Sequence, residues 1–169
     1  MLEQESESTL ADESGERQVR GLLRQYIEIV DNARLHDWVE LFTAGGSYFV
    51  TTRENDERGL PIAFVYDDTK DRIRDRVAYV EEVWHGHYND YRQRHILSDP
   101  SIEWVAGGSV HLTVGFAIYI AEHGRSGSRL LLTGAYHDTL VVEDGHLKFD
   151  TKKVIVDSDV LPRYFVYPL

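Results

Sequence analysis

Cysteine is absent from this sequence of 169 residues. Disulfide bonds are therefore excluded, and so are zinc sites built on thiolates and iron–sulfur clusters held by cysteine alone. Because structural disulfides belong to oxidising compartments, their exclusion agrees with a cytoplasmic location, which we expect for this chain.

Long apolar segments are also missing. No apolar run approaches the roughly 18 residues that a membrane-spanning helix needs. The first residues, MLEQESESTLADESGE, have neither the positive start nor the apolar middle of a signal peptide. They carry six acidic residues and no basic residue before Arg17. We expect residues 1–16 to form a flexible acidic arm in front of a single domain over residues 17–169.

Basic residues are scarce, since 18 Lys and Arg against 29 Asp and Glu give a formal net charge of −11. Nucleic acids and anionic membranes attract basic proteins, so this balance argues against both as partners. Phosphate-binding glycine patterns and a serine in a nucleophile elbow are absent as well. Because there is also no cysteine, the sequence gives no support to nucleophilic catalysis.

Hydrophobic residues make up 42% of the chain, and their spacing indicates helices first and strands later. Apolar residues at three- and four-residue spacing predict helices over residues 17–34 and 69–84, with a shorter one over 37–42. A polar loop is expected over residues 54–61. The predicted strands cover residues 47–53, 93–104 with an interruption near Pro100, 109–121, 129–142 and 146–157. An Asp-Gly pair between the last two indicates a tight hairpin.

Helices that precede a run of antiparallel strands predict the α+β class rather than a parallel doubly wound sheet. We expect a curved, mixed or antiparallel sheet wrapped around three helices from the first half of the chain, which makes a cone with a cavity. In the strand over 109–121, the even-numbered residues from Val110 to Ile120 are all apolar, whereas the odd-numbered residues are mixed. The mixed face is expected to line the cavity.

The stretch HGHYNDYRQRH, residues 85–95, concentrates histidine and carboxylate side chains. His85, His87 and Asp90 have the residue types of the two-histidine, one-carboxylate iron site. Their spacing is loose, however, and a glycine and an asparagine among them indicate the exit of a helix. No regular element would hold all three on one side, so we favour a solvated loop over a metal site.

Asp31 and His95 form a candidate acid–base pair. Asp31 falls in the last turn of the first helix, on its apolar side, and His95 starts a central strand. A buried carboxylate could orient the imidazole and make it a general base near neutral pH. A tyrosine could then polarise a substrate oxygen, and the candidates are Tyr26, Tyr48, Tyr119 and Tyr136. In the structural alternative, which spacing alone favours, Asp31 is a cap or pairs with Arg34 or Arg94, and His95 is a satisfied core residue.

The last ten residues, VLPRYFVYPL, are largely apolar and aromatic. A free tail of this composition would promote aggregation, so we expect it to be covered. An oligomer interface is favoured over docking on the tail's own domain.

Six segments together resemble the small (β) subunit of the bacterial aromatic-ring-hydroxylating dioxygenases. They are YIEIVDNARLHDWVELF, YFVTTREN, RGLPIAFVYDDTKDRIRDRV, RQRHILSDPSIEW, GAYHDTLVVEDGHLKF and KKVIVDSDVLPRYFVYP. No single segment is diagnostic, but their order and spacing over residues 17–169 are fairly specific. The resemblance implies the nuclear-transport-factor-2-like, cystatin-like cone.

The resemblance also implies a partner without catalytic residues, cofactor or metal of its own. In that family the Rieske [2Fe–2S] cluster, the mononuclear Fe(II) and the substrate pocket belong to the large α subunit, and a β trimer supports an α trimer (α3β3). The absence of cysteine agrees, because a Rieske cluster needs cysteine and histidine pairs. The expected interface anchors are Trp84, Arg92, Arg94, Trp104, Arg163 and Tyr164.

The same cone also resembles small dehydratases and isomerases, which use an Asp from the first helix and a His from the strand after the third. Asp31 and His95 fall at those places, so a free-standing enzyme with Tyr48 as a third group stays open, as does a ligand-binding cone. The arginines of RQRH fit the β subunit better. The ending LPRYFVYPL is also typical of an assembly tail and not of a lid over a pocket.

Overall fold

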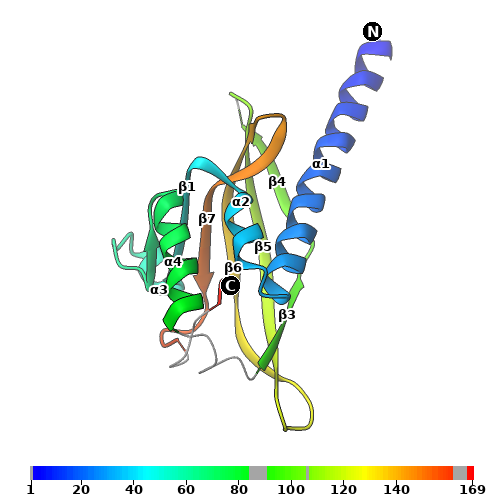
Figure 1. Cartoon of the computed structure of the whole chain (residues 1–169). Helices are drawn as coiled ribbons and strands as arrows, with labels where there is room; N and C mark the ends of the chain where they lie inside the picture. The colour runs from blue at the N-terminus through cyan, green and yellow to red at the C-terminus, as the bar shows by residue number, and fades with distance from the viewer. Residues whose placement is uncertain (1, 84–90, 106, 162–166) are drawn as a thin grey trace.

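The computed structural model describes residues 2–83, 91–105, 107–161 and 167–169, and for residues 2–12 it describes the helical backbone alone. The helices of this part are α1 (Leu2–Asp31), α2 (Leu35–Glu40), α3 (Arg53–Glu57) and α4 (Lys70–Val83) (Figure 1). The strands are β1 (Phe42–Thr52), β2 (Val65–Asp67), β3 (Tyr91–Leu97), β4 (Ser101–Val105), β5 (Ser109–Glu122), β6 (Arg129–Glu143) and β7 (His146–Val156).

The strands form one sheet in the order β2-β1-β7-β6-β5-β3, and β4 also pairs with β5. β1 and β7 run parallel, whereas the other described pairs are antiparallel. Figure 1 shows the sheet curving around α2 and the C-terminal half of α1. The predicted α+β class and the curved mixed sheet are therefore confirmed.

The β6–β7 hairpin turns at Asp144-Gly145, as the sequence predicts. Their φ angles are 53° and 78°, so both residues are left-handed, as a type I′ turn requires. The turn, with a bulge after Thr139, sets the register that places Asp138 of β6 opposite Lys152 of β7.

The apolar face of β5 fills the core. Its even-numbered residues from Val110 to Ile120 are all buried and, apart from Ile120, belong to the same cluster as Leu22 and Tyr26 of α1. His111 and Tyr119, on the mixed face, are exposed on the outside of the sheet. The prediction that the mixed face lines a cavity is thus wrong. The apolar face turns inward because burying it removes more apolar area from water.

α1 is longer than the sequence predicts, since it begins at Leu2 and not at residue 17. Residues 2–16 contain many Glu, Gln, Leu and Ala, which favour helix, and no proline. An independent motion of residues 1–16 stays a prediction. Within the described residues, no helix is both long and apolar enough to cross a membrane.

The polar segment over residues 54–61 is not all loop, because α3 covers its start. The Thr52 side chain caps this short helix by accepting a hydrogen bond from the Asn55 N–H at 3.1 Å. This cap explains a turn of helix at a place where hydrophobic spacing gives no signal.

Gly134 of β6 has no space for a side chain. A Cβ there would lie 2.8 Å from the Phe116 ring and still closer to the Ile155 carbonyl oxygen. We expect Gly134→Ala to lower the free energy of unfolding by about 1–3 kcal/mol in denaturant titrations, because the backbone of β7 must shift. The control is Gly21→Ala in α1, where nothing lies within 4 Å of the new Cβ. That change should raise the free energy by about 0.5–1 kcal/mol, and equal effects of the two changes would contradict this packing.

Candidate functional site

The structure brings Asp31 and His95 together, as their positions in the sequence suggest. Asp31 is the last residue of α1, and His95 lies in β3. Gln93 of β3 donates its side-chain amide to the Val30 carbonyl oxygen at 2.8 Å, which ties the strand to the last turn of the helix. The Asp31 Oδ1 atom then lies 2.6 Å from the His95 Nδ1 atom.

The Asp31 carboxylate also satisfies the backbone of β3. The His95 backbone N–H donates to both carboxylate oxygens at 3.2 Å, on the side of the strand that faces away from β5. Because a carboxylate only accepts hydrogen bonds, the ring nitrogen Nδ1 of His95 carries a proton, and Nε2 is the acceptor of a neutral ring. Arg94 lies 3.9 Å from Asp31 Oδ2, but its side chain is 74% exposed, so this ion pair contributes little.

The pair is sealed from solvent. The His95 side chain has no exposed area, and the Asp31 side chain is 4% exposed. The buried His95 Nε2 atom has no hydrogen-bond partner in the described structure. A surface pocket of about 350 Å³ reaches Asp31 but is not lined by His95. A general base must reach the proton that it removes, so the closed pair acts as a structural tie between α1 and β3.

Tyr48, the third group of the dehydratase interpretation, is occupied by the chain itself. The Leu169 N–H donates to the Tyr48 hydroxyl at 3.0 Å, and the Tyr26 hydroxyl donates to the Leu169 main-chain oxygen. Burial raises the pKa of the Tyr48 hydroxyl well above its usual value, so the group stays neutral at physiological pH. Tyr48 therefore holds main chain and does not face an open cavity.

The end of the described chain docks on its own domain, because Leu169 is 1% exposed and finds two hydroxyl partners there. Leu169 therefore follows the alternative of docking on the tail's own domain, and an oligomer interface formed by the rest of the tail stays a prediction. Docking within the domain is favoured because it buries the Leu169 side chain and pairs the main-chain polar groups together. Arg163 and Tyr164 lie outside the described residues.

A second buried ion pair, between Lys152 and Asp138, was not predicted from the sequence. The Lys152 Nζ atom lies 2.9 Å from Asp138 Oδ2, and both side chains have no exposed area. The ammonium group also lies 3.6 Å from the Tyr136 ring centroid and 4.1 Å from the Tyr26 ring centroid. Burial lowers the pKa of the Lys152 ammonium and raises the pKa of the Asp138 carboxyl, while their mutual attraction opposes both shifts. The signal in the sequence is opposite charges at inward, alternating positions of two paired strands.

The other candidate residues do not gather into a site. His85, His87, Asp90 and Trp84 lie outside the described residues. In the part of the chain that the structure covers, no three His, Cys, Asp or Glu side chains are placed to hold a metal ion. Arg92, Arg94 and Trp104 are exposed, and the Trp104 ring also packs against Gly15 of α1, where a Cβ would overlap it.

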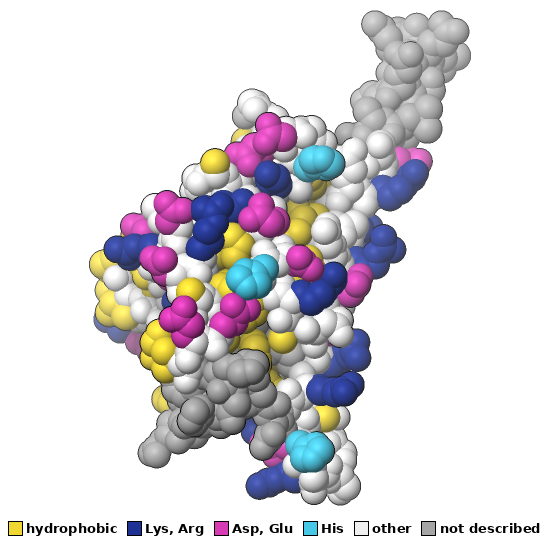
Figure 2. Space-filling model, viewed as in Figure 1, with side chains coloured by type: hydrophobic (Ala, Val, Ile, Leu, Met, Phe, Trp, Pro, Cys, Tyr) yellow, Lys and Arg dark blue, Asp and Glu magenta, His cyan; other side chains and the backbone are white. Residues whose placement is uncertain are grey.

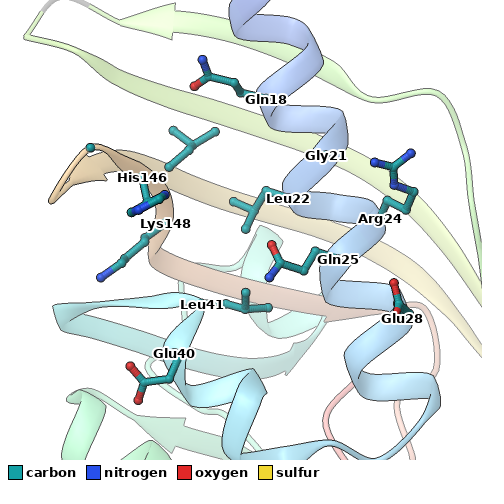
Figure 3. A pocket seen from close by; sticks show the side chains of 12 residues that line it. Gln18, Gly21, Leu22, Arg24, Gln25, Glu28, Glu40, Leu41, His146 and Lys148 are labelled. Carbon is teal, nitrogen blue, oxygen red and sulfur yellow. The ribbon is translucent and has the colours of Figure 1, made fainter.

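A groove of about 780 Å³ runs between α1 and the β6–β7 hairpin. Figure 3 shows Gln18, Leu22 and Gln25 of α1 on one side of it and Lys148 of the hairpin on the other. Lys148 is held by the Glu143 carboxylate at 2.8 Å. The lining consists of the His146 imidazole with amide, aliphatic and charged side chains of both signs. Among the described residues, His146 makes no hydrogen bond or ion pair with a carboxylate, so the groove does not hold a coupled acid–base pair.

Comparison with known proteins decides to which family this chain belongs. Residues 26–163 match the family model described as the ring hydroxylating beta subunit. The chain is a member of the ring-hydroxylating β-subunit family. The small subunit of anthranilate 1,2-dioxygenase from Burkholderia cepacia is 27% identical to it over 148 residues, which are 88% of this chain and 90% of that relative. The resemblance drawn from the six sequence segments is thereby confirmed.

Solved structures show that this β subunit shares its fold with proteins of different classes. A structure assigned as the β subunit of an aromatic-ring-hydroxylating dioxygenase from Novosphingobium aromaticivorans superposes with a TM-score of 0.78 at 24% identity, covering 88% of this chain and 92% of that one. A structure assigned as a scytalone dehydratase from the same organism superposes with a TM-score of 0.67 at 16% identity, covering 92% and 93%. The fold is common to both, so the sequence family separates them.

We expect Asp31→Asn to destabilise this β subunit. The neutral amide loses the charge that strengthens the hydrogen bond to the His95 ring, and its NH2 group takes the place of Oδ2, which accepts from the His95 backbone N–H. The free energy of unfolding should fall by about 1–3 kcal/mol in urea titrations. The control is Asp99→Asn, whose carboxylate is exposed and should leave the unfolding midpoint unchanged. Equal midpoints for both variants would show that Asp31 is not a structural tie.

Lys152→Met should leave the Asp138 carboxylate buried without its cation. We expect a loss of about 3–5 kcal/mol in the free energy of unfolding at neutral pH. The double variant Asp138→Leu with Lys152→Met should recover most of that loss, because no uncompensated charge is left inside. A double-mutant cycle measured by denaturant unfolding checks both values. A single Lys152→Met variant as stable as the parent chain would contradict the buried pair.

Proposed function

We propose that this chain is the structural β subunit of a multicomponent, cytoplasmic aromatic-ring-hydroxylating dioxygenase and carries no catalytic residue of its own. The family match over residues 26–163 carries the proposal. The relatives of this chain include named small subunits of such oxygenases, among them that of anthranilate 1,2-dioxygenase. The aromatic substrate would be chosen by the α subunit and not by this chain.

The redox centres would belong to the α subunit. A Rieske [2Fe–2S] cluster is held by two cysteines and two histidines, and this chain has no cysteine to offer. The donor set therefore does not fit the cluster, and we derive no redox step through this chain. The mononuclear Fe(II) would also be held by the α partner.

The chain would assemble through its surface into an α3β3 complex, in which three β subunits form a trimer at the base. The exposed residues Leu60, Ile62, Phe64 and Tyr66 form an apolar strip along and before β2, which is an edge strand of the sheet. Figure 2 shows hydrophobic side chains at the left margin of the molecule, on the side where Figure 1 labels α3 and α4. An apolar strip on a sheet edge is a liability for a free monomer, which supports burial against another subunit.

In the dehydratase alternative the residue types are right, but a substrate could not reach them. Asp31 and His95 are paired, yet the imidazole has no exposed area and its second nitrogen reaches no solvent. Tyr48 is bonded to Leu169 and not directed at an open pocket. The closed geometry supports the β-subunit proposal over acid–base catalysis in the cone.

The proposal is tested by co-expressing the tagged chain with an α subunit encoded beside it. We expect the two to co-purify at equal stoichiometry, with a mass by light scattering that fits α3β3. Iron and turnover of an aromatic substrate should be found only with the complex, whereas the chain alone should be a trimer with neither. Stoichiometric iron on the isolated chain, or a monomer that dehydrates a substrate unaided, would refute it.

A surface variant tests the assembly role separately from folding. Ile62→Asp places a charge in the apolar strip and should weaken association of the complex at least tenfold in analytical ultracentrifugation. Val142→Asp is the matched control, because that residue is equally exposed but lies at the β6–β7 hairpin. If both variants assemble like the parent, the strip is not an interface.

A further inference from the structure

The inside of the cone is filled by a segment of main chain and not only by side chains of the sheet and helices. Leu169 lies between a tyrosine of α1 and a tyrosine of β1. Its N–H donates to the Tyr48 hydroxyl at 3.0 Å, and its main-chain oxygen accepts from the Tyr26 hydroxyl. The two hydroxyls thus present one acceptor and one donor to a guest, and the guest is the chain itself.

The surrounding interior holds further polar atoms that lack partners. They are fully buried in the described structure: Trp38 Nε1, His95 Nε2, Tyr136 Oη and Asp138 Oδ1. Two of the side chains pack directly on the tyrosines that hold Leu169. The Trp38 and Tyr48 ring centroids are 5.0 Å apart, and those of Tyr26 and Tyr136 are 6.0 Å apart. Buried polar groups are normally paired, so this cluster has unused hydrogen-bonding capacity beside an aromatic wall.

The segment of residues 167–169 also forms part of a surface pocket. Tyr167 is a wall of the 350 Å³ surface pocket that reaches Asp31, and its ring packs edge-on against Tyr91 with centroids 5.9 Å apart. Leu169, two residues further on, is itself buried. Removing residues 167–169 would therefore take away one wall of this pocket and free the two tyrosine hydroxyls that hold Leu169.

We propose that residues 167–169 are an internal stopper seated in a binding site for a small phenol. A phenol hydroxyl donates one hydrogen bond and accepts another, so it can replace the Leu169 N–H at Tyr48 and the Leu169 oxygen at Tyr26. Its ring suits walls made of tyrosine, tryptophan and phenylalanine, because aromatic rings pack favourably edge to face. The fold thus retains a ligand site that this chain keeps closed with its own residues.

Opening the stopper tests the proposal, with 4-nitrophenol as the probe in isothermal titration calorimetry, in a buffer below the pKa of the probe so that its hydroxyl keeps the proton that it donates. Two variants open it: a chain that ends at Val166, and the full chain with Leu169→Asp, whose charge cannot stay buried beside the tyrosines. We expect each to bind 4-nitrophenol with a Kd at least tenfold lower than the parent chain. Val160→Asp is the control, because that side chain is exposed and the Kd should not change.

The peptide acetyl-Tyr-Pro-Leu provides a second readout. Added to the opened variants, it should occupy the vacated site and raise the apparent Kd for 4-nitrophenol, while leaving the parent chain unaffected. Opened variants that keep the parent's circular dichroism but bind the phenol no better overturn the proposal, and so does a peptide that does not compete. If neither variant folds, residues 167–169 are part of the core and not a stopper, which also overturns it.

Discussion

The buried ammonium group of Lys152 constrains the whole interior of the cone. A cation without solvent needs an anion and polarisable neighbours, and it finds Asp138 on the paired strand and the rings of Tyr26, Tyr136 and Phe149 around it. Because those rings come from α1, β6 and β7, the cation fixes how the first helix sits on the sheet. The position of Tyr26 in turn decides where Leu169 can be held.

The Asp31–His95 pair shows why the chemistry of a site depends on access as much as on residue identity. The distance of 2.6 Å and the hydrogen bond of the carboxylate to Nδ1 would suit a general base. In this β subunit the same contacts join the end of α1 to an edge strand, and the free nitrogen meets protein instead of substrate. A constellation used for proton transfer elsewhere can therefore persist as a structural tie.

Sequence patterns predicted much of the fold and of the candidate site, and each feature that they missed has a physical reason. Period-two spacing identified which residues of β5 share a face, and Asp144-Gly145 identified the hairpin, because both are local; which face of β5 turns inward was predicted wrongly. Asp31 and His95 could be predicted to lie near each other only because the expected fold brings the first helix next to that strand. The sequence could not reveal that the interior around them is closed to solvent. Lys152 was missed because lysine is rarely buried. The docking of Leu169 depends on partners far away in the chain, which no local pattern records.

The parallel pairing of β1 with β7 has a consequence for how the protein is made. β1 is synthesised early, yet the strand that it pairs with at Ser47 and Thr151 is the last of the sheet, and Tyr26 waits for a residue 143 positions further on. Such distant contacts slow folding and leave apolar strands uncovered for longer. The sheet can close only when β7 has left the ribosome, so a partner subunit that recognises the finished cone cannot bind it before β7 is made.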